Sequence, residues 1–358
     1  MSDESPRAGV VIGGRYQLGK LIGEGRTGRV YRAHDTKSTE RVAVKLLHKP
    51  LCSVPEPVRR FAREFEATRR IDHPNVVRSI AFGQQADGPL EGTHFLVMEL
   101  LDGRRLVDVL ASGPLDAART VRIALDVAQA LAAAHQEGIV HRDVEPSNVV
   151  LQRVRGKDVA KVLDFGLARL ASNDEALTDF GIRLGTAEYM SPEYVETGEL
   201  EPRSDVYALG VMMYAMLTGA PPFVGRMLIV MQEQVTATPP PLSIRVPGVA
   251  TWLEVLVMEM LAKQPEHRPS AVEVVERLRE NLAATDLEVG VERRALASFE
   301  GSAMPPPAAV AHHSEQAPVY PDPKPLPKVP LLITVALLGF GLIGLVGLTS
   351  IVGVLLMI

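Results

Sequence analysis

Cysteine is almost absent from this chain. Its 358 residues include a single cysteine, Cys52, which excludes an internal disulfide and any metal site built from several cysteines. A folded protein without disulfides is typical of a reducing, intracellular compartment. The apolar stretch of a secretory signal is also missing from residues 1–9, which are mainly polar.

An excess of basic residues is missing as well. Lys and Arg number 38 against 43 Asp and Glu, which gives a net charge of −5 and an isoelectric point near 6.0. Nucleic-acid-binding proteins usually carry the opposite imbalance, so we expect no nucleic-acid partner. The chain does have 46% hydrophobic and 23% charged residues. This is the composition of a folded protein, and the length leaves room for about two domains.

A long uncharged run follows Lys328. Residues 329–358 contain no charged side chain and are rich in Leu, Val, Ile and Gly. A membrane-spanning helix needs about 20 apolar residues, so this run predicts one transmembrane helix. A buried core helix is the alternative, but core helices rarely run this far without a polar face. Because Lys324 and Lys328 precede the run, we expect a cell-membrane anchor with the preceding chain on the cytoplasmic side.

Proline separates this run from the rest of the chain. Nine prolines lie between Gly301 and Pro330, a density that prevents helix or sheet and favours an extended spacer. The predicted organisation is therefore an N-terminal tail over 1–15, a folded unit over 16–282, a proline-rich juxtamembrane linker over 283–328 and the helix over 329–358.

The folded unit changes character along its length. Residues 16–100 contain short β-branched runs and one helical stretch, whereas residues 101–282 are mainly helical in pattern. An α+β fold with a small β-rich lobe, a larger helical lobe and a cleft between them follows from this order. The strands are expected at Arg41–Leu47 and Thr93–Leu100, and the helices at Val58–Ile71, Asp116–Glu137, Asp205–Leu217, Thr251–Leu261 and Ser270–Leu282, the last with Ser270 as its N-cap.

Three glycines form the first motif that suggests chemistry. Gly23, Gly25 and Gly28 read G-x-G-x-x-G and are followed by a strand-like stretch that includes Val30. A dinucleotide-binding fingerprint would open a helix at this point, so we interpret the motif as a hairpin whose backbone can approach phosphates. Further on, Lys45 lies within an apolar run, where a lysine needs a carboxylate or phosphate partner. A lysine of an edge strand that faces water is the alternative.

Three more motifs follow in order. His141-Arg142-Asp143 is followed by Asn148, then comes Asp164-Phe165-Gly166, and a Gly-Thr-x-x-Tyr-x-x-Pro-Glu stretch runs from Gly185 to Glu193. Any one of them could be a loop without chemistry. All of them together, in this order and at this spacing, are very specific.

With these motifs the chain resembles bacterial serine/threonine protein kinases of the eukaryotic-like (Hanks) type. The resemblance covers residues 16–282 and implies a bilobal protein-kinase fold, with the N-lobe over 16–100 and the C-lobe over 101–282. It also implies ATP and Mg²⁺ as cofactors and proteins with Ser or Thr hydroxyls as substrates. For phosphorylation of one copy by another, it further implies a homodimer.

The resemblance assigns the catalytic and phosphate-binding roles residue by residue. Lys45 would hold the α- and β-phosphates and pair with an acid on the N-lobe helix, which the family spacing places at Glu64, with Glu66 as the alternative. Asp143 would take the proton of the substrate hydroxyl. Gly23, Gly25 and Gly28 would cover the ATP phosphates, and Asn148 and Asp164 would bind Mg²⁺.

The adenine pocket is implied in the same way. Met98 would be the gatekeeper, and the Glu99 carbonyl and the Leu101 backbone would meet the adenine edge. The apolar walls would be Ile22, Val30, Ala43 and Val150. Burial alone does not separate these roles from those of ordinary core residues. Two structural roles are implied as well, with Asp205 bracing the catalytic loop and Glu193 pairing with Arg268.

Regulatory positions lie within these motifs and in the segment between the last two of them. Thr186 lies in a context that resembles serine/threonine kinases rather than tyrosine kinases. Arg142 would receive a phosphate on the activation loop, and Thr178 lies in that loop. An ordinary solvent-facing threonine is the alternative for Thr178.

One position departs from the family pattern. The family has a lysine two residues after the catalytic Asp, whereas this chain has Glu145. At about 4 Å and an effective dielectric near 20, each unit-charge interaction with the transferring phosphoryl group is roughly 4 kcal/mol. A slow kinase is therefore one reading. A catalytically impaired pseudokinase that acts as an ATP-binding, membrane-tethered scaffold is the other.

Overall fold

The computed structural model describes residues 9–165 and 187–282. Several predictions lie outside these residues: the regulatory positions Thr178 and Thr186, the linker over 283–328 and the transmembrane helix over 329–358. Within the described part of the chain, no helix is both long and apolar enough to cross a membrane.

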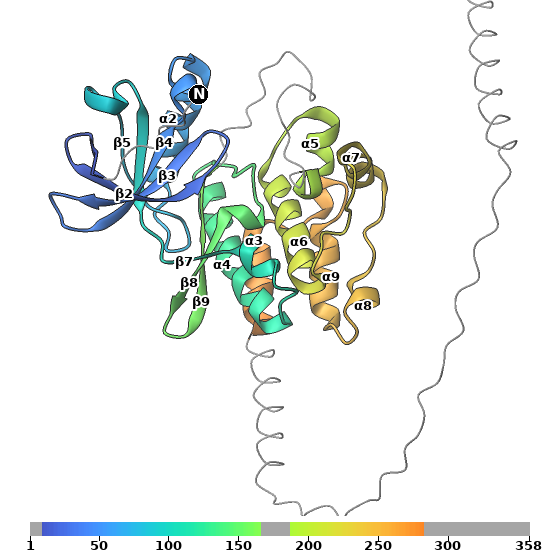
Figure 1. Cartoon of the computed structure of the whole chain (residues 1–358). Coiled ribbons are helices and arrows are strands. Elements are labelled where there is room, and N and C mark those ends of the chain that lie inside the picture. The colour runs from blue at the N-terminus through green and yellow to red at the C-terminus, as the bar shows by residue number, and fades with distance from the viewer. Residues whose placement is uncertain (1–8, 166–186, 283–358) are drawn as a thin grey trace, which may run out of the picture. The chain divides into compact units, whose positions relative to one another are not determined.

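The first lobe is built on an antiparallel six-stranded sheet in the order β1-β2-β3-β4-β6-β5 (Figure 1). The central strand β4 is buried at every residue except its first. Its side chains alternate between two apolar clusters, since Val42, Val44 and Leu46 join one and Ala43 and Leu47 the other. The elements are β1 Val11–Ile12, β2 Tyr16–Glu24, β3 Gly28–Asp35, β4 Arg41–Leu47, α1 Lys49–Cys52, α2 Pro55–Arg70, β5 Ser79–Gln84 and β6 His94–Glu99.

Strand β1 lies in the segment predicted as an N-terminal tail. Val11 pairs with Gln17 across β2, and Ile12 is fully buried. Arg15 then holds Asp35 through two hydrogen bonds of 2.8 and 2.6 Å. The ordered sheet therefore begins before Tyr16, because a short edge strand and a bidentate ion pair fix residues that a composition boundary assigns to the tail.

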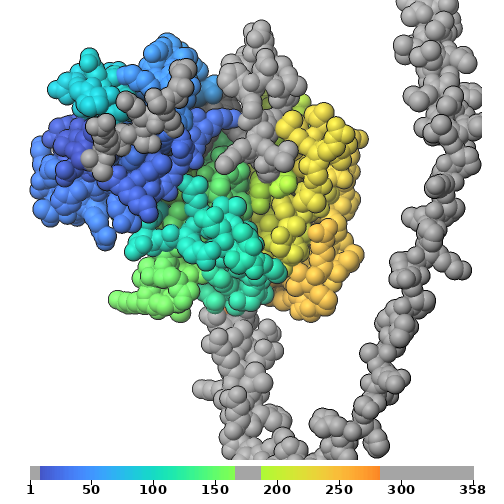
Figure 2. All heavy atoms as spheres, in the orientation of Figure 1, coloured from blue at the N-terminus to red at the C-terminus, as the bar shows by residue number. Residues whose placement is uncertain are grey.

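The second lobe is mainly helical, with a small sheet in the order β7-β8-β9. Helix α6 is buried at every residue from Ser204 to Leu217, which makes it the centre of the lobe, and β9 packs along α4 (Figure 1). Its elements are β7 Gly103–Arg105, α3 Leu106–Leu110, α4 Ala117–Gln136, β8 Val149–Val154, β9 Lys157–Val162, α5 Pro192–Thr197, α6 Pro202–Thr218, α7 Met227–Thr236, α8 Leu242–Arg245, α9 Thr251–Met260 and a helix over 271–282. Figure 2 shows the blue residues of the first lobe on one side and the yellow and orange helices on the other.

The helix starts follow from local capping chemistry. Asp116 accepts a hydrogen bond of 2.7 Å from the Arg119 amide at the start of α4. Ser270 and Glu273 form a reciprocal capping box, in which the Glu273 carboxylate accepts from the Ser270 amide at 2.7 Å and the Ser270 hydroxyl accepts from the Glu273 amide at 3.3 Å. The predicted N-cap at Ser270 is therefore present. The predicted α+β architecture of two lobes is present as well.

The two lobes are tied together beside the helix α2. The Asn75 side chain donates to the Ala160 carbonyl at 2.8 Å, and Val76 forms a bridge to Val162 in β9. Lys161 in β9 also donates to Glu99 at the end of β6, at 2.6 Å. These contacts hold residues 75–76, which follow α2, and the end of β6 against β9, and Asp164 comes two residues after β9.

Candidate active site

Lys45 lies between two carboxylates from different parts of the fold. Its ammonium group is 2.7 Å from Glu64 Oε1 on α2 and 2.9 Å from Asp164 Oδ2, two residues after β9. Glu66, the alternative partner, instead lies 3.7 Å from Arg69 and is largely exposed. The structure therefore pairs Glu64 with Lys45, and the alternative of a water-facing edge lysine is wrong, since Lys45 is 8% exposed.

Two carboxylates around one ammonium give this cluster an excess of negative charge. Burial raises the pKa of Glu64 to about 7, and the Asp164 carboxylate adds to this effect while Lys45 opposes it. Burial would lower the pKa of Lys45, but the charges of Asp164 and Glu64 reverse this and raise it. Burial likewise works against the ionised form of Asp164, yet Lys45 keeps the pKa of Asp164 below its usual value. The cluster is therefore suited to accept further positive charge.

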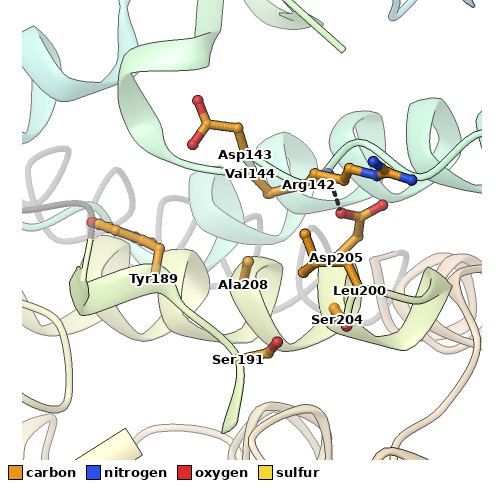
Figure 3. Close-up of a pocket in the computed structure, with 9 residues that line it drawn as sticks. All are labelled: Arg142, Asp143, Val144, Tyr189, Ser191, Leu200, Ser204, Asp205 and Ala208. Atoms are coloured by element: carbon orange, nitrogen blue, oxygen red, sulfur yellow. Dashed lines mark hydrogen bonds between the residues drawn. The ribbon is translucent and has the colours of Figure 1, made fainter. Parts of the chain in front are cut away.

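The catalytic loop is fixed by a buried carboxylate beneath it. Asp205 on α6 accepts hydrogen bonds of 2.8 Å from the amides of both His141 and Arg142. Arg142 takes a left-handed backbone conformation, with φ of 70°, which such external hydrogen bonds stabilise. In Figure 3 the Asp143 side chain points away from Asp205. The bracing role expected for Asp205 is thus present in the structure.

Asp143 and Asn148 contact each other directly. The Asn148 amide nitrogen donates to the Asp143 carboxylate and to the Asp143 carbonyl, both at 2.9 Å. The Asn148 backbone carbonyl accepts from Leu163 at 2.8 Å, and Leu163 directly precedes Asp164. These contacts bring the three predicted polar residues of the catalytic loop and the metal site to one place.

The donor set fits Mg²⁺. The Asn148 nitrogen is engaged by Asp143, which leaves the Asn148 side-chain oxygen as its available donor, and Asp164 adds a carboxylate that is 40% exposed. Oxygen donors of this kind suit Mg²⁺, which usually takes one or two carboxylates and completes its shell with water and substrate phosphates. Among residues 9–165 and 187–282, no group of three or more His, Cys, Asp and Glu is placed to hold a metal by itself.

The glycine motif forms the turn between β2 and β3, as predicted. Gly25 donates to the Gly28 carbonyl at 2.9 Å, and a Cβ on Gly28 would lie only 2.1 Å from the Leu46 carbonyl oxygen. Glycine is therefore required at position 28 by the close approach of β4. Two contacts here were not predicted: the His48 ring bonds the Gly25 carbonyl at 2.8 Å, and the Arg105 guanidinium lies against Gly23. Neither residue belongs to a motif.

The predicted adenine-pocket residues are only partly brought together. Ala43 and Met98 are buried in one apolar cluster, with Val30 and Leu101 packed against it. Val150 is also buried, on β8, whereas Ile22 is 44% exposed on β2 and lies outside this cluster. The Glu99 carboxylate accepts from Lys161 at 2.6 Å and from the Arg78 amide at 2.8 Å, while the predicted contact of the Glu99 carbonyl with adenine stays a prediction.

Glu145 keeps its backbone within the catalytic loop. Its carbonyl accepts from the Asn148 amide at 3.0 Å, and its half-buried carboxylate accepts a hydrogen bond from the Ser147 hydroxyl. Burial raises the pKa of Glu188, and the charge of Glu145 raises it further. The Glu145 carboxylate is therefore electrostatically close to the segment that follows Thr186.

Arg142 offers one sign of an anion receptor. Its Nε atom is buried and has no hydrogen-bond partner in the described part of the chain. Thr178, whose phosphate Arg142 would receive, and Thr186 both lie outside the described residues.

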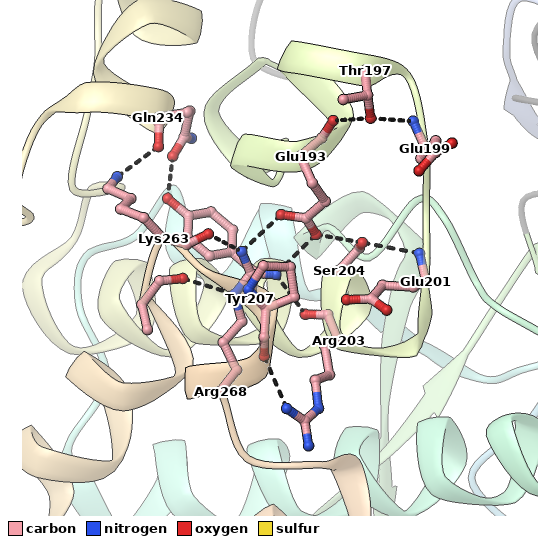
Figure 4. Close-up of polar contacts among 12 residues, drawn as sticks. Glu193, Thr197, Glu199, Glu201, Arg203, Ser204, Tyr207, Gln234, Lys263 and Arg268 are labelled. Carbon is pink, nitrogen blue, oxygen red and sulfur yellow. Dashed lines mark hydrogen bonds and ion pairs between the residues drawn. The ribbon is translucent and has the colours of Figure 1, made fainter.

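Glu193 and Arg268 form the predicted pair. Two hydrogen bonds of 2.8 and 2.7 Å join the carboxylate to the fully buried guanidinium (Figure 4). The Arg268 side chain also donates to the carbonyls of Ala262 and Lys263 at 2.7 and 2.8 Å. This network fixes the segment after the activation loop against the C-terminal helices, which is a structural role.

The comparisons with known proteins agree with this geometry. The model of the protein kinase domain family matches residues 16–278. The serine/threonine-protein kinase pkn3 of Myxococcus xanthus is 37% identical over 80% of this chain and 52% of its own length. PknB of Mycobacterium leprae is 37% identical over 71% of this chain and 40% of its own length. A crystal structure of the Mycobacterium tuberculosis PknI kinase domain matches with a TM-score of 0.60 and 28% identity, covering 78% of this chain and all of that one.

This chain therefore belongs to the protein kinase family. Its described lobes form a bacterial Hanks-type serine/threonine protein kinase domain, which confirms the predicted class and the predicted bilobal kinase fold. The chain spans about half or less of the length of pkn3 and of PknB, the two curated relatives named above.

Proposed function

We propose that this protein transfers the γ-phosphoryl group of ATP to Ser and Thr hydroxyls of protein substrates. The observation that carries the proposal is the position of Lys45 between Glu64 and Asp164, at 2.7 and 2.9 Å. This pairing is the arrangement that phosphoryl transfer in kinases requires. The contact between Asn148 and Asp143 at 2.9 Å supports Asp143 as the base at the same site.

The roles follow from the contacts. Lys45 would meet the α- and β-phosphates, and Asp143, oriented by the Asn148 amide, would accept the proton of the substrate hydroxyl as the new O–P bond forms. Asn148 and Asp164 would hold Mg²⁺, which when bound neutralises the charge on the phosphate oxygens. The hairpin at Gly28 would cover the phosphates.

Glu145 supports a second candidate function. A carboxylate where the family has a lysine repels the transferring phosphoryl group instead of attracting it. A pseudokinase that binds ATP and regulates a partner without phosphorylating it would keep Lys45 and Asp164 and tolerate this change. We favour the slow kinase because Asp143, Asn148 and the Lys45 pair are all retained.

The location of the protein belongs to the same proposal. The uncharged run over 329–358 and the proline-rich linker over 283–328 support a single-pass anchor in the cell membrane with the kinase domain on the cytoplasmic side. We further propose that Thr178 is an activating phosphosite whose phosphate meets Arg142. A homodimer would allow one copy to phosphorylate the other.

One experiment separates the two functions. The purified full chain is incubated with labelled ATP, Mg²⁺ and a generic protein substrate, next to Asp143→Asn and Lys45→Ala. A kinase transfers label, slowly but above both variants. A chain that is stabilised by ATP–Mg²⁺ in a thermal shift but transfers no more label than Asp143→Asn is a scaffold, and a chain that does neither contradicts both functions.

A further inference from the structure

A second pocket lies on the first lobe, at the end of the sheet where the chain leaves β6 for the second lobe. Its volume is about 340 Å³, and its walls come from β3, the start of β4, the residue before β5 and the segment after β6. None of the catalytic residues Lys45, Asp143, Asn148 and Asp164 lines it. It therefore lies apart from the predicted phosphate-binding and metal-binding residues, but it shares Glu99 and Leu101 with the predicted adenine-contacting segment.

Three arginines from three different segments line this pocket. They are Arg32 on β3, Arg41 at the start of β4 and Arg78 just before β5. Within the described residues, none of the three guanidinium groups makes a hydrogen bond or an ion pair, although Arg15, Arg119 and Arg268 of the same fold are all paired through their side chains. The pocket thus holds three positive groups without counter-charges in contact.

The sheet register brings two of these exposed arginines close together. Arg32 pairs with Ala43, and Arg41 is two residues before Ala43 on the same strand. Arg32 and Arg41 are therefore diagonal neighbours on one face of the sheet, typically about 7–8 Å apart, within reach of each other's long side chains. Two like charges on neighbouring side chains repel each other, and although water and salt weaken this repulsion at exposed side chains, an anion between them removes it.

The carboxylates of the pocket do not neutralise the arginines. Glu99 is engaged by Lys161 at 2.6 Å and by the Arg78 backbone amide at 2.8 Å. Glu40 and Asp102 also line the pocket, but neither forms an ion pair with an arginine in this part of the structure. The pocket therefore contains three unpaired guanidinium groups and two unpaired carboxylates, so the net charge of its unpaired groups is positive.

We infer that this pocket binds a phosphate monoester dianion. Guanidinium groups bind phosphate oxygens in a planar, bidentate geometry and are the side chains that proteins use most for this chemistry. A pocket of about 340 Å³ holds a phosphorylated side chain or a small phosphate ester rather than an isolated ion. Two sources carry the same chemistry, namely a phosphorylated Ser or Thr of a protein and a free phosphate ester.

The test uses the full chain with Mg²⁺ and a saturating, non-hydrolysable ATP analogue, so that phosphate binding at the nucleotide site is blocked. Isothermal titration at low ionic strength compares phosphothreonine, a short peptide with one phosphothreonine and the same peptide unphosphorylated. The test variant is Arg32→Gln/Arg41→Gln/Arg78→Gln. The matched control is Arg155→Gln/Arg226→Gln/Arg279→Gln, which removes the same number of positive charges from exposed arginines elsewhere that have no side-chain partner among the described residues.

We expect the native chain to bind both phosphorylated probes. The triple variant should bind them at least about tenfold more weakly, and the control should bind them with unchanged affinity. No binding of the unphosphorylated peptide is expected. A peptide that binds more tightly than phosphothreonine identifies a phosphoprotein as the source, and equal affinities identify a free ester. Should the triple variant fail to fold, the three single variants, each checked by its melting temperature, must each weaken binding.

Equal affinities of the native chain and the triple variant would overturn the inference. So would a loss of binding in the control, which would mean that net charge rather than the pocket attracts the probe. If Arg142→Gln abolished binding of the phosphorylated probes while the triple variant still bound them, the phosphate would be assigned to the catalytic-loop arginine instead.

Discussion

Replacing Glu145 by lysine should accelerate phosphoryl transfer. The residue is held within the catalytic loop, since its carbonyl accepts from Asn148 at 3.0 Å and Asn148 in turn contacts Asp143 at 2.9 Å. A lysine at this position keeps the same backbone contact and places a positive charge where a negative one now lies. The change therefore acts on the electrostatics of the transferring group, with the loop geometry retained.

The expected increase in rate follows from the charge at position 145 and its surroundings. A single unit-charge interaction at about 4 Å and an effective dielectric near 20 is roughly 4 kcal/mol, or about three decades of rate. Glu145 is half-buried and its carboxylate is hydrogen-bonded to Ser147, so water and Mg²⁺ screen part of this interaction. We expect an increase of about ten- to a thousandfold in kcat with little change in the affinity for ATP, because Lys45 and the metal hold the ground-state nucleotide.

Single-turnover phosphorylation of a generic basic substrate by both proteins measures the effect. Glu145→Gln is the matched control, because it removes the negative charge without adding a positive one and should fall between the other two rates. A native protein as fast as Glu145→Lys would mean that another cation already fills this role. A lysine variant that binds ATP but remains inactive would refute the electrostatic reasoning and favour the scaffold.

Four further outcomes are expected. Deleting residues 329–358 should move the protein from the membrane to the soluble fraction with ATP binding intact, whereas a truncated chain that still pellets would contradict the anchor. Thr178→Ala should lower activity, and phosphopeptide mapping after incubation with ATP should find Thr178 modified; a fully active variant would count against this site. Gly28→Ala should lower the free energy of unfolding, measured in urea, by about 1–3 kcal/mol, because its Cβ would lie 2.1 Å from the Leu46 oxygen. Gly25→Ala should lower it less, because its Cβ would come no nearer than 3.9 Å to the Gly28 oxygen. Burial, with the charge of Arg268, lowers the pKa of Lys263 to about 8 from 10.5, so the unfolded chain binds more protons than the folded chain between pH 8 and pH 10.5. The melting temperature of the native protein should therefore rise with pH over this range, relative to that of Lys263→Met. Equal dependence of the two melting temperatures on pH would show that Lys263 stays charged in the folded protein.

Short-range patterns predicted the elements well. Strand β4 has the predicted bounds Arg41–Leu47, and the helix over 271–282 begins at the predicted N-cap Ser270, which forms a capping box with Glu273. Such features depend on alternation and on hydrogen bonds between residues a few positions apart, which a sequence shows directly. The edge strand β1 was missed because two residues carry no pattern, and only their pairing with β2 makes them a strand.

The sequence predicted which residues form the site, but only some of the contacts between them. The motif order identified Lys45, Asp143, Asn148 and Asp164, and the structure brings them together. Ile22 is exposed and lies outside the apolar cluster of Ala43 and Met98, so its place in the adenine pocket stays a prediction. Contacts made by residues outside any motif could not be predicted, because nothing in their local sequence marks them. His48 against Gly25 and Arg105 against Gly23 are of this kind.

The sequence by itself determined the class of this protein, because the order and spacing of the kinase motifs are properties of the chain. The choice between Glu64 and Glu66 needed the fold: residues two apart on a helix point about 200° away from each other, so the direction in which α2 faces β4 selects Glu64. The pocket of Arg32, Arg41 and Arg78 likewise exists only in the folded state. Its arginines come from separate segments, and only the pairing of the strands and the exit of the chain from β6 place three like charges around one cavity.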